Sequence, residues 1–109
     1  MSNIYETTII VKPDLANDQM KNLVSSIDQF FSENNTPIGY KEDWGIKNLK
    51  FSINKYSKGS FKFMRFISTP DFPKKLDIFL KFNSDCLRFL ITKSSNELEE
   101  ATPQINKDN

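Results

Sequence analysis

Several residue types that catalytic sites need are scarce or absent in this sequence. It contains no histidine, so the commonest general base and metal ligand is missing. Its three glycines, Gly39, Gly45 and Gly59, cannot build a glycine-rich phosphate loop. The single cysteine, Cys86, excludes an internal disulfide and lies in an apolar run without a histidine partner, which favours a packed thiol over a nucleophile. We therefore expect no enzyme, no catalytic residue, no metal site, no cofactor and no small-molecule substrate.

Long hydrophobic runs are also missing. No apolar stretch approaches the roughly 20 residues that a membrane-spanning helix needs. The opening residues, MSNIYETTII, lack a basic segment followed by a long apolar one, so we expect no secretory signal and no membrane partner. With the one cysteine, which fits a reducing compartment, this predicts a cytoplasmic protein.

Charge is close to balanced in total but unevenly spread. The chain has 109 residues, 38% hydrophobic and 27% charged, which suits one domain with a real core. Its net charge is +1, yet residues 41–93 hold twelve Lys or Arg against five acids, a balance of +7. Residues 1–40 and 94–109 each carry −3. A basic middle of this kind is typical either of a polyanion-binding surface or of a solvated, lysine-rich sheet face.

The apolar periodicity predicts six elements and a tail. Two helices are indicated by stripes at helical spacing, the first comprising Met20, Leu23, Val24, Ile27, Phe30 and Phe31 after an N-cap at Asn17, and the second Leu76, Phe79 and Leu80 after a cap at Asp71. Four strands are expected near 5–11, 38–53, 60–68 and 86–93, with a polar hairpin loop at Asn54 to Gly59. Residues 94–109 have four acids and no aromatic, which predicts a flexible acidic tail after a domain of residues 1–93.

This β-α-β-β-α-β order favours an α+β fold of the split βαβ, or ferredoxin-like, type, with a four-stranded antiparallel sheet and both helices on one face. One phase of each strand then faces the helices, and the other stays exposed or meets a partner. In the second strand Trp44 and Ile46 share one phase, whereas Leu49, Phe51 and Ile53 share the other. This change of phase predicts a bulge or bend near Lys47-Asn48.

The segment GIKNLKFSIN, from Gly45 to Asn54, resembles the signature of the bacterial small-subunit ribosomal protein six (S-six) family. The segments YETTIIVKPDL, SKGSFKFMRF and LRFLITK are similar to that family's first, third and fourth strands, and the resemblance spans Tyr5 to Lys93. Lys50 and Phe51 depart from the family's usual residues. The resemblance implies a ferredoxin-like structural protein of the small-subunit platform, on the cytoplasmic ribosome. It also implies that the protein pairs with ribosomal protein eighteen and contacts a junction in the central domain of the small-subunit ribosomal RNA.

Given the resemblance, the best candidates for RNA contact are basic residues of the hairpin loop and the last strand. These are Lys55 and Lys58, together with Arg88 and Lys93. Such side chains can reach phosphate oxygens, and arginine can bind them in a bidentate fork. Plain solvation is the competing interpretation for each lysine. Trp44 and Ile46 are the candidates for contact with ribosomal protein eighteen, because one layer of helices leaves the second face of the sheet uncovered.

The aromatic residues of the middle segment leave two further functions open. Phe61, Phe63 and Phe66 could stack on bases, as in a single-stranded RNA-binding domain of the RNA-recognition-motif type, although the match needs an insertion at Ser60. We expect at least two of these rings to pack in the protein instead. A small dimerising regulatory domain is the other alternative, since this fold serves many such roles.

Overall fold

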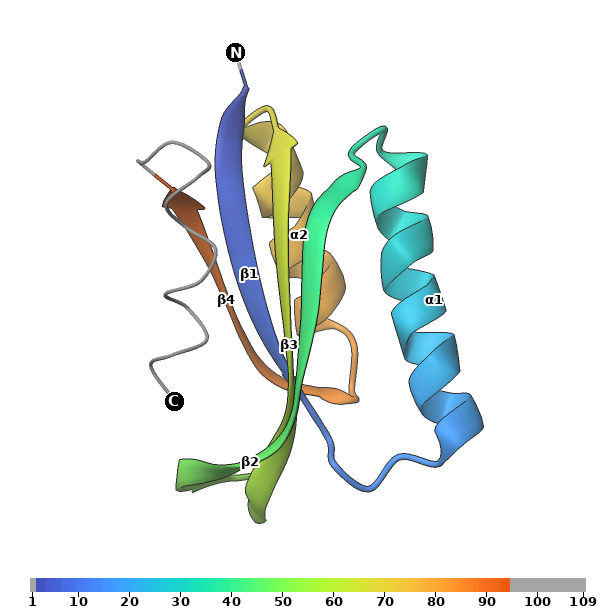
Figure 1. The fold of residues 1–109 in the computed structure, drawn as a ribbon, viewed down its shortest axis with the longest axis vertical. Coiled ribbons are helices and arrows are strands. Elements are labelled where there is room, and N and C mark those ends of the chain that lie inside the picture. The colour runs from blue at the N-terminus through green and yellow to red at the C-terminus, as the bar shows by residue number, and fades with distance from the viewer. Residues whose placement is uncertain (1, 95–109) are drawn as a thin grey trace.

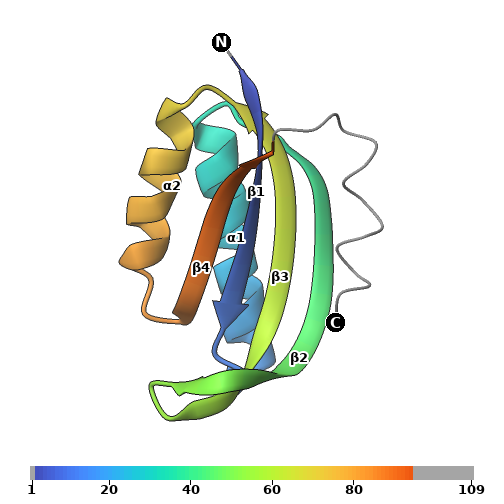
Figure 2. The same cartoon turned by 90° about the vertical axis from the view of Figure 1, so that its left-hand side faces the viewer.

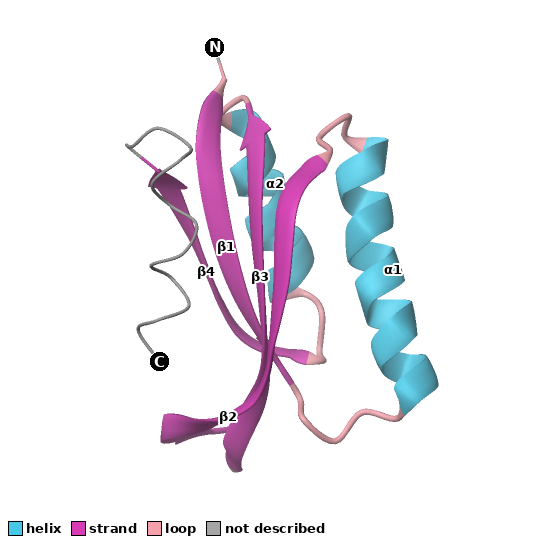
Figure 3. Cartoon of the chain, viewed as in Figure 1, coloured by secondary structure: helices cyan, strands magenta, loops and turns pink. Residues whose placement is uncertain are grey.

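The computed structural model describes residues 2–94. Its elements are β1 (Asn3–Val11), α1 (Asn17–Glu33), β2 (Ile38–Ile53), β3 (Tyr56–Ser68), α2 (Asp71–Lys81) and β4 (Cys86–Ser94) (Figure 3). The predicted element order is confirmed. Of the predicted tail at residues 94–109, only Ser94 is among the described residues, where it ends β4. The division into a domain and a tail therefore stays a prediction.

The four strands form one antiparallel sheet in the order β2-β3-β1-β4, so β2 and β4 are its edges. Both helices cover the same face, as Figures 1 and 2 show from two directions. The predicted ferredoxin-like arrangement is confirmed. We call the uncovered side of the sheet the open face. It includes Glu6 and Thr8 of β1 with Phe63 and Arg65 of β3, because cross-strand partners share a face and the faces alternate along each strand.

The core joins the two helices to the sheet through three phenylalanines. Phe31 of α1, Phe66 of β3 and Phe72 of α2 are at most 4% exposed. Their ring centroids lie 5.0 Å apart for Phe31 and Phe66, 4.9 Å for Phe31 and Phe72, and 5.4 Å for Phe66 and Phe72. All three pairs meet edge to face, which is a favoured geometry for aromatic rings. This cluster fixes where the helices sit on the sheet.

Each helix begins one residue away from its predicted cap. The N-cap position of α1 is Ala16, and Asn17 is already helical. The backbone N–H of Ala16 donates to Gln19 Oε1 at 3.0 Å. A side chain of the first helical turn thus satisfies the N–H of the cap residue. In α2 the cap position is Pro70 rather than Asp71. Asp71 instead places its negative charge in the first turn, where the helix dipole favours it.

Strand β2 is irregular both ahead of the predicted position, Lys47-Asn48, and directly after it. The register with β3 shifts between Asp43 and Gly45, which makes Trp44 the extra residue, and it shifts again between Asn48 and Ile53. Asp43 Oδ1 accepts the Gly45 N–H at 3.0 Å, and Gly45 has a φ of 77°, which glycine adopts without strain. Trp44 and Ile46 therefore do not share a phase: Ile46 pairs with Ser60, which belongs to the helix-side row of β3.

The hairpin loop is shorter than predicted. Only Asn54 and Lys55 form the turn, with φ values of 49° and 71°, and Ile53 pairs directly with Tyr56. Two positive φ values in succession match the twist of a two-residue hairpin, and asparagine tolerates the first of them well. Lys58 therefore lies in β3 and not in a loop. We call residues 47–59 the hairpin arm, which extends past the other strands and curves across one end of the sheet (Figures 1 and 2).

Candidate nucleic-acid interface

A buried arginine organises the open face. Arg65 is 8% exposed, and its Nε donates to Glu6 Oε2 at 3.2 Å. Its guanidinium carbon lies 5.1 Å from the centroid of the Tyr40 ring and 5.5 Å from that of Phe63. A buried charge is tolerated only when it is paired, and here an ion pair and two aromatic rings surround it. Arg65 is therefore part of the framework and is not exposed for binding.

Trp44 covers the next part of the same face. Its ring stacks on Phe63, with centroids 5.5 Å apart and planes 7° from parallel, and its indole N–H donates to Glu42 Oε1 at 2.6 Å. The Tyr40 hydroxyl also donates to Glu42, and this hydrogen bond raises the pKa of Tyr40. Lys47 places its ammonium 5.3 Å from the centroid of the Trp44 ring. Trp44 is thus held in place by contacts with its own strand and with β3.

The phenylalanines of β3 pack mainly inside the protein. Phe66 lies in the core, whereas Phe63 is only 3% exposed because Trp44 lies over it on the open face. Phe61 is half-buried. The expectation that at least two of the three rings pack is confirmed. Base stacking needs accessible ring faces, so this arrangement speaks against a binding mode of the RNA-recognition-motif type.

Three of the four predicted RNA contacts lie at one end of the sheet. Lys55 is at the tip of the hairpin arm, Lys58 is in its second strand, and Arg88 pairs with Ile10 near the start of β4. All three are exposed. Arg88 lies on the open face, beside the end over which the arm curves (Figure 2).

Lys93 lies apart from these residues. It pairs with Tyr5 at the far end of β4 and belongs to the helix-side row of the strand. It lines a shallow groove with Lys74, Asp77 and Ile78 of α2. A single flat RNA surface cannot contain both Arg88 and Lys93, because they face opposite sides of the sheet.

The two predicted partner residues both lie on the edge strand β2 but on opposite sides of it. Trp44 is half-buried on the open face, whereas Ile46 is 58% exposed in the helix-side row. Phe51, further along the same strand, is 80% exposed. The exposed apolar surface near the predicted site thus follows the free edge of β2.

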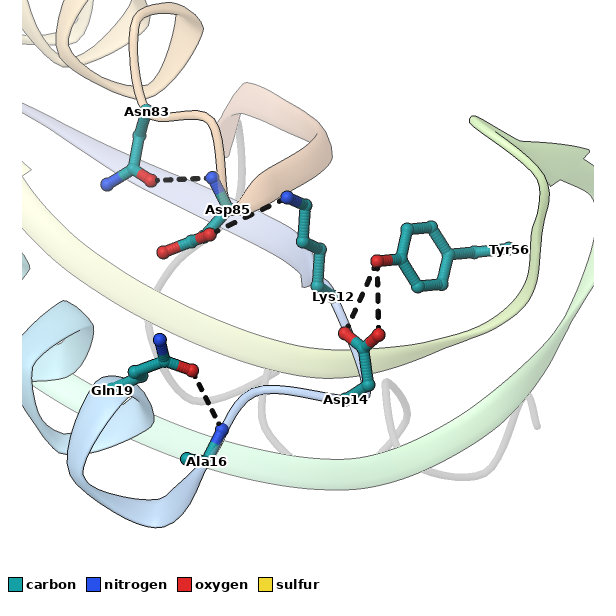
Figure 4. Close-up of polar contacts among 7 residues, drawn as sticks. All are labelled: Lys12, Asp14, Ala16, Gln19, Tyr56, Asn83 and Asp85. Carbon is teal, nitrogen blue, oxygen red and sulfur yellow. Dashed lines mark hydrogen bonds and ion pairs between the residues drawn. The ribbon is translucent and has the colours of Figure 1, made fainter.

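The hairpin arm is tied near its tip to the β1–α1 loop, next to an ion pair that joins this loop to the α2–β4 loop, as Figure 4 shows. The Tyr56 hydroxyl donates to both carboxylate oxygens of Asp14, at 3.3 Å and 3.2 Å. Beside them Lys12 Nζ lies 3.8 Å from Asp85 Oδ1, and the Lys12 N–H donates to the Asp85 carbonyl at 3.0 Å. Asp85 is held in turn by Asn83, whose Oδ1 accepts the Asp85 N–H at 3.0 Å. Three segments far apart in sequence therefore meet at the end that carries Lys55, Lys58 and Arg88.

Sequence reasoning did not single out Glu6, Arg65, Tyr56 or Asp14. The signal for Arg65 was a charge inside an apolar strand, which implies a nearby partner, but nothing local pointed to Glu6, 59 residues away. The contact between Tyr56 and Asp14 had no local signal either, since it depends on how the arm curves.

Two features bear on whether the described residues could hold a metal ion or a reactive thiol. Among residues 2–94, no three His, Cys, Asp or Glu side chains lie together in a way that would hold a metal ion. Burial raises the pKa of the Cys86 thiol to about 11, and a smaller effect of the Arg88 backbone acts in the opposite direction. Cys86 packs against the core, whereas strict alternation along β4 would place it on the face of Arg88. The register shift between Ile10 and Val11 accounts for the difference.

The family model for ribosomal protein S6 matches residues 4–93 of this chain. The chain belongs to the ribosomal protein S6 family. The resemblance seen in the sequence is thereby confirmed, and the family indicates a structural rather than a catalytic role. As a ribosomal protein of the small subunit, the protein is part of the cytoplasmic ribosome. Neither α1 nor α2, the helices of the described residues, is long and apolar enough to cross a bilayer.

Individual relatives agree with this assignment. The small ribosomal subunit protein bS6 of Aquifex aeolicus is 33% identical over 87 residues, which are 79% of this chain and 79% of that protein. The bS6 protein of Rickettsia canadensis is 26% identical over 103 residues, or 94% of this chain and 85% of that protein. The crystal structure of 30S ribosomal protein S6 from Thermotoga maritima superimposes with a TM-score of 0.80 at 20% identity, covering 86% of this chain and 89% of that one. The two structures share the fold.

Proposed function

We propose that this S6 protein is a structural component of the small ribosomal subunit that binds the central domain of small-subunit ribosomal RNA together with ribosomal protein eighteen. The observation that carries the proposal is a group of exposed basic residues without ion-pair partners among the described residues. Within residues 2–94, Lys55, Lys58 and Arg88 form no ion pair, and they lie at one end of the sheet. Cations that no carboxylate neutralises are available to phosphate.

The hairpin arm adds reach to this charge. No acidic residue occurs between Lys47 and Arg65, so the arm presents its lysines without a local carboxylate in sequence. The tip of the arm projects beyond the other strands, where it can approach an RNA backbone without any movement of the sheet (Figure 2). Contacts of this kind position a protein on RNA and carry little sequence information. With a net charge of only +1, the protein fits a binding unit in which a basic partner supplies further phosphate contacts.

The RNA contacts are tested with a triple variant, Lys55→Ala, Lys58→Ala and Arg88→Ala. It is assayed as the complex with ribosomal protein eighteen on a transcript of the central domain, over a range of salt concentrations. The slope of log affinity against log salt should become shallower by about one unit for each phosphate interaction that the substitutions remove. A matched control removes three exposed helix lysines that also lack ion pairs within residues 2–94: Lys21, Lys74 and Lys75. If both triple variants shift affinity equally, the effect is net charge alone and the proposed surface is wrong.

Lys93 is kept as a separate test because of its place in the sheet. It is exposed in the helix-side row, away from the hairpin arm. An RNA that wraps around the β4 edge would contact it, whereas an RNA confined to the hairpin end would not. The single variant Lys93→Ala should therefore reduce the salt slope only in the first case, and an unchanged slope removes Lys93 from the proposed surface.

For the partner, the supporting observation is the exposed edge of β2. Trp44 and Ile46 stand on either side of this edge, so a partner that pairs with or clasps the strand would contact both. Mixing this protein with ribosomal protein eighteen should give a one-to-one complex in size-exclusion chromatography, and Ile46→Ser should weaken it. Ile46→Ser is preferred to a change at Trp44, which stacks on Phe63 and would disturb the sheet itself. Two separate peaks at micromolar concentration would contradict the proposal, and a self-associated peak would favour the dimerising domain.

A further inference from the structure

Positive charge alone does not let an arm bind RNA well if the arm itself is loosely held. Residues 47–59 extend beyond the sheet, and a two-stranded hairpin on its own is marginally stable in water. Every flexible residue that binding must order lowers the affinity. High affinity for RNA therefore requires contacts that hold the arm in its bound position in the free protein.

The described residues provide two such contacts. At the arm's base, Gly59 packs so closely on β1 that a Cβ there would lie 2.4 Å from Ile10 Cγ2 and 3.5 Å from Leu49 Cδ2. Nearer the tip, the Tyr56 hydroxyl donates to the Asp14 carboxylate in the β1–α1 loop (Figure 4). Tyr56 immediately follows the turn residue Lys55, so this hydrogen bond restrains the part of the arm that carries the proposed RNA contact.

We propose that Tyr56 is a positioning residue, whose hydrogen bond to Asp14 fixes the hairpin arm so that Lys55 and Lys58 meet RNA phosphates in one preformed geometry. This inference rests on the proposed RNA-binding function. Tyr56 itself contacts no RNA and acts through the arm. Its role is to raise the fraction of molecules in which the arm is already in its bound position, and the apparent affinity scales with that fraction.

The chemistry of the pair suits this role. A tyrosine hydroxyl is neutral, so it holds the Asp14 carboxylate without using a cation of the arm. Partial desolvation, followed by the nearby charges of Asp14 and Asp85, raises the pKa of Tyr56 above its ordinary value of 10.0, so the hydroxyl is protonated at physiological pH with or without this shift. The neighbouring pair of Lys12 and Asp85 joins the β1–α1 loop, to which Tyr56 is hydrogen-bonded, to the α2–β4 loop.

The first test is Tyr56→Phe, which removes only the hydroxyl. In the complex with ribosomal protein eighteen, affinity for the central-domain transcript should fall about two- to tenfold, the range expected when one hydrogen bond no longer favours the docked arm. The salt slope should not change, because every phosphate interaction is retained. In the free protein, the ¹⁵N heteronuclear NOE of residues 47–59 should decrease. A parallel decrease in salt slope would instead mean that Tyr56 contacts phosphate directly, which would overturn the inference.

The second test uses two variants of Asp14 that share the same charge. Asp14→Asn keeps a carbonyl oxygen that can accept from Tyr56, whereas Asp14→Ala does not. The asparagine variant should bind RNA better than the alanine variant and keep the arm ordered, which a pure charge effect would not predict. Thermal unfolding should show that all three variants remain folded.

The outcomes separate this inference from the function on which it rests. If the triple variant of Lys55, Lys58 and Arg88 binds RNA as the wild type does, the proposed RNA surface is wrong, and Tyr56 has nothing to position. If that triple variant loses affinity but Tyr56→Phe keeps wild-type affinity and wild-type arm order, the RNA surface stands and the role of Tyr56 is refuted.

Discussion

The close contact at Gly59 makes a quantitative prediction about stability. An alanine Cβ at this position would lie 2.4 Å from Ile10 Cγ2, about 1 Å inside the 3.4 Å at which ordinary contact begins. Ile10 cannot easily move its methyl group away, because a β-branched side chain is stiff at χ1. Either the hairpin arm must lift from β1 or Ile10 must leave its rotamer, and both disturb the sheet.

The expected cost of Gly59→Ala is that of overpacking a site with little room, about 1–3 kcal/mol. For a domain of this size each kcal/mol lowers the melting temperature by roughly 4–8 °C. Urea denaturation followed by circular dichroism gives the free energy of unfolding by linear extrapolation. We expect a lower denaturation midpoint with an unchanged slope, because the surface exposed on unfolding stays the same.

A double-mutant cycle tests the cause. Ile10→Ala removes the obstructing methyl group, so adding Gly59→Ala in that background should cost at least about 1 kcal/mol less than it does alone. Gly39→Ala is the matched control, since a Cβ there would meet only the Arg65 carbonyl at 3.5 Å. It should change stability by less than about 1 kcal/mol. If Gly59→Ala costs the same in both backgrounds, the contact with Ile10 is not its cause and the reasoning fails.

Three further predictions concern the core and two titratable groups. Leu76→Ala should lower the free energy of unfolding by about 2–5 kcal/mol in urea denaturation, because Leu76 is fully buried; a smaller decrease would mean that the helices repack. Cys86, with its pKa raised by burial to about 11, should react with iodoacetamide at pH 8 far more slowly in the folded protein than in urea, as measured by mass spectrometry; equal rates would contradict its burial. Desolvation alone would raise the pKa of Asp43, but the Gly45 N–H and Lys62 outweigh desolvation and lower the pKa. The ionised Asp43 carboxylate therefore stabilises the fold above about pH 3.9, and this stabilisation is lost as pH falls through the folded pKa. Asp43→Asn should therefore flatten the acid side of the stability curve in pH-dependent urea titrations. An unchanged curve would show that the Gly45 N–H and Lys62 do not stabilise the ionised Asp43 carboxylate.

Much of the fold could be predicted from the sequence because the apolar pattern of most elements is unambiguous. The stripe of Leu23, Ile27 and Phe31 has helical spacing, and these are the residues of α1 that are buried. The β-branched segment predicted as the first strand likewise forms β1, in which alternate positions from Tyr5 to Val11 are buried. Such periodicities identify the face of an element that turns inward, and with six elements few arrangements can bury all of them.

Strand β2 shows where this reasoning is incomplete. The change of apolar phase indicated that one extra residue must exist, but periodicity cannot locate it within several residues. The deciding interactions were local and polar: Asp43 accepts the Gly45 N–H, and Gly45 adopts a positive φ. The hairpin turn was misplaced for a related reason, since Ser57 and Lys58 look like loop residues, although the turn needs only Asn54 and Lys55.

The candidate site was harder to predict than the fold because it depends on contacts between distant segments. The basic segment of the sequence contains both Lys62 and Arg65, yet each forms an ion pair with a carboxylate, Asp43 and Glu6 respectively. A charge count from the sequence cannot distinguish Lys62 and Arg65 from the exposed lysines of the arm. Only the positions of the acidic residues in space separate structural cations from those that remain available.

That separation explains how a nearly neutral protein can offer a cationic surface. Two acids, Asp14 and Asp85, lie in the loops beside the hairpin arm, where unpaired carboxylates would oppose RNA binding (Figure 4). Asp85 is paired with Lys12, a residue of the body, and Asp14 accepts its hydrogen bonds from the uncharged Tyr56. If one of the arm's own lysines paired with Asp14 instead, that cation would be neutralised and lost to phosphate binding. The anchoring of the arm and its charge are therefore assigned to different side chains, and this allows the arm to be fixed while Lys55 and Lys58 stay free of partners within the described residues.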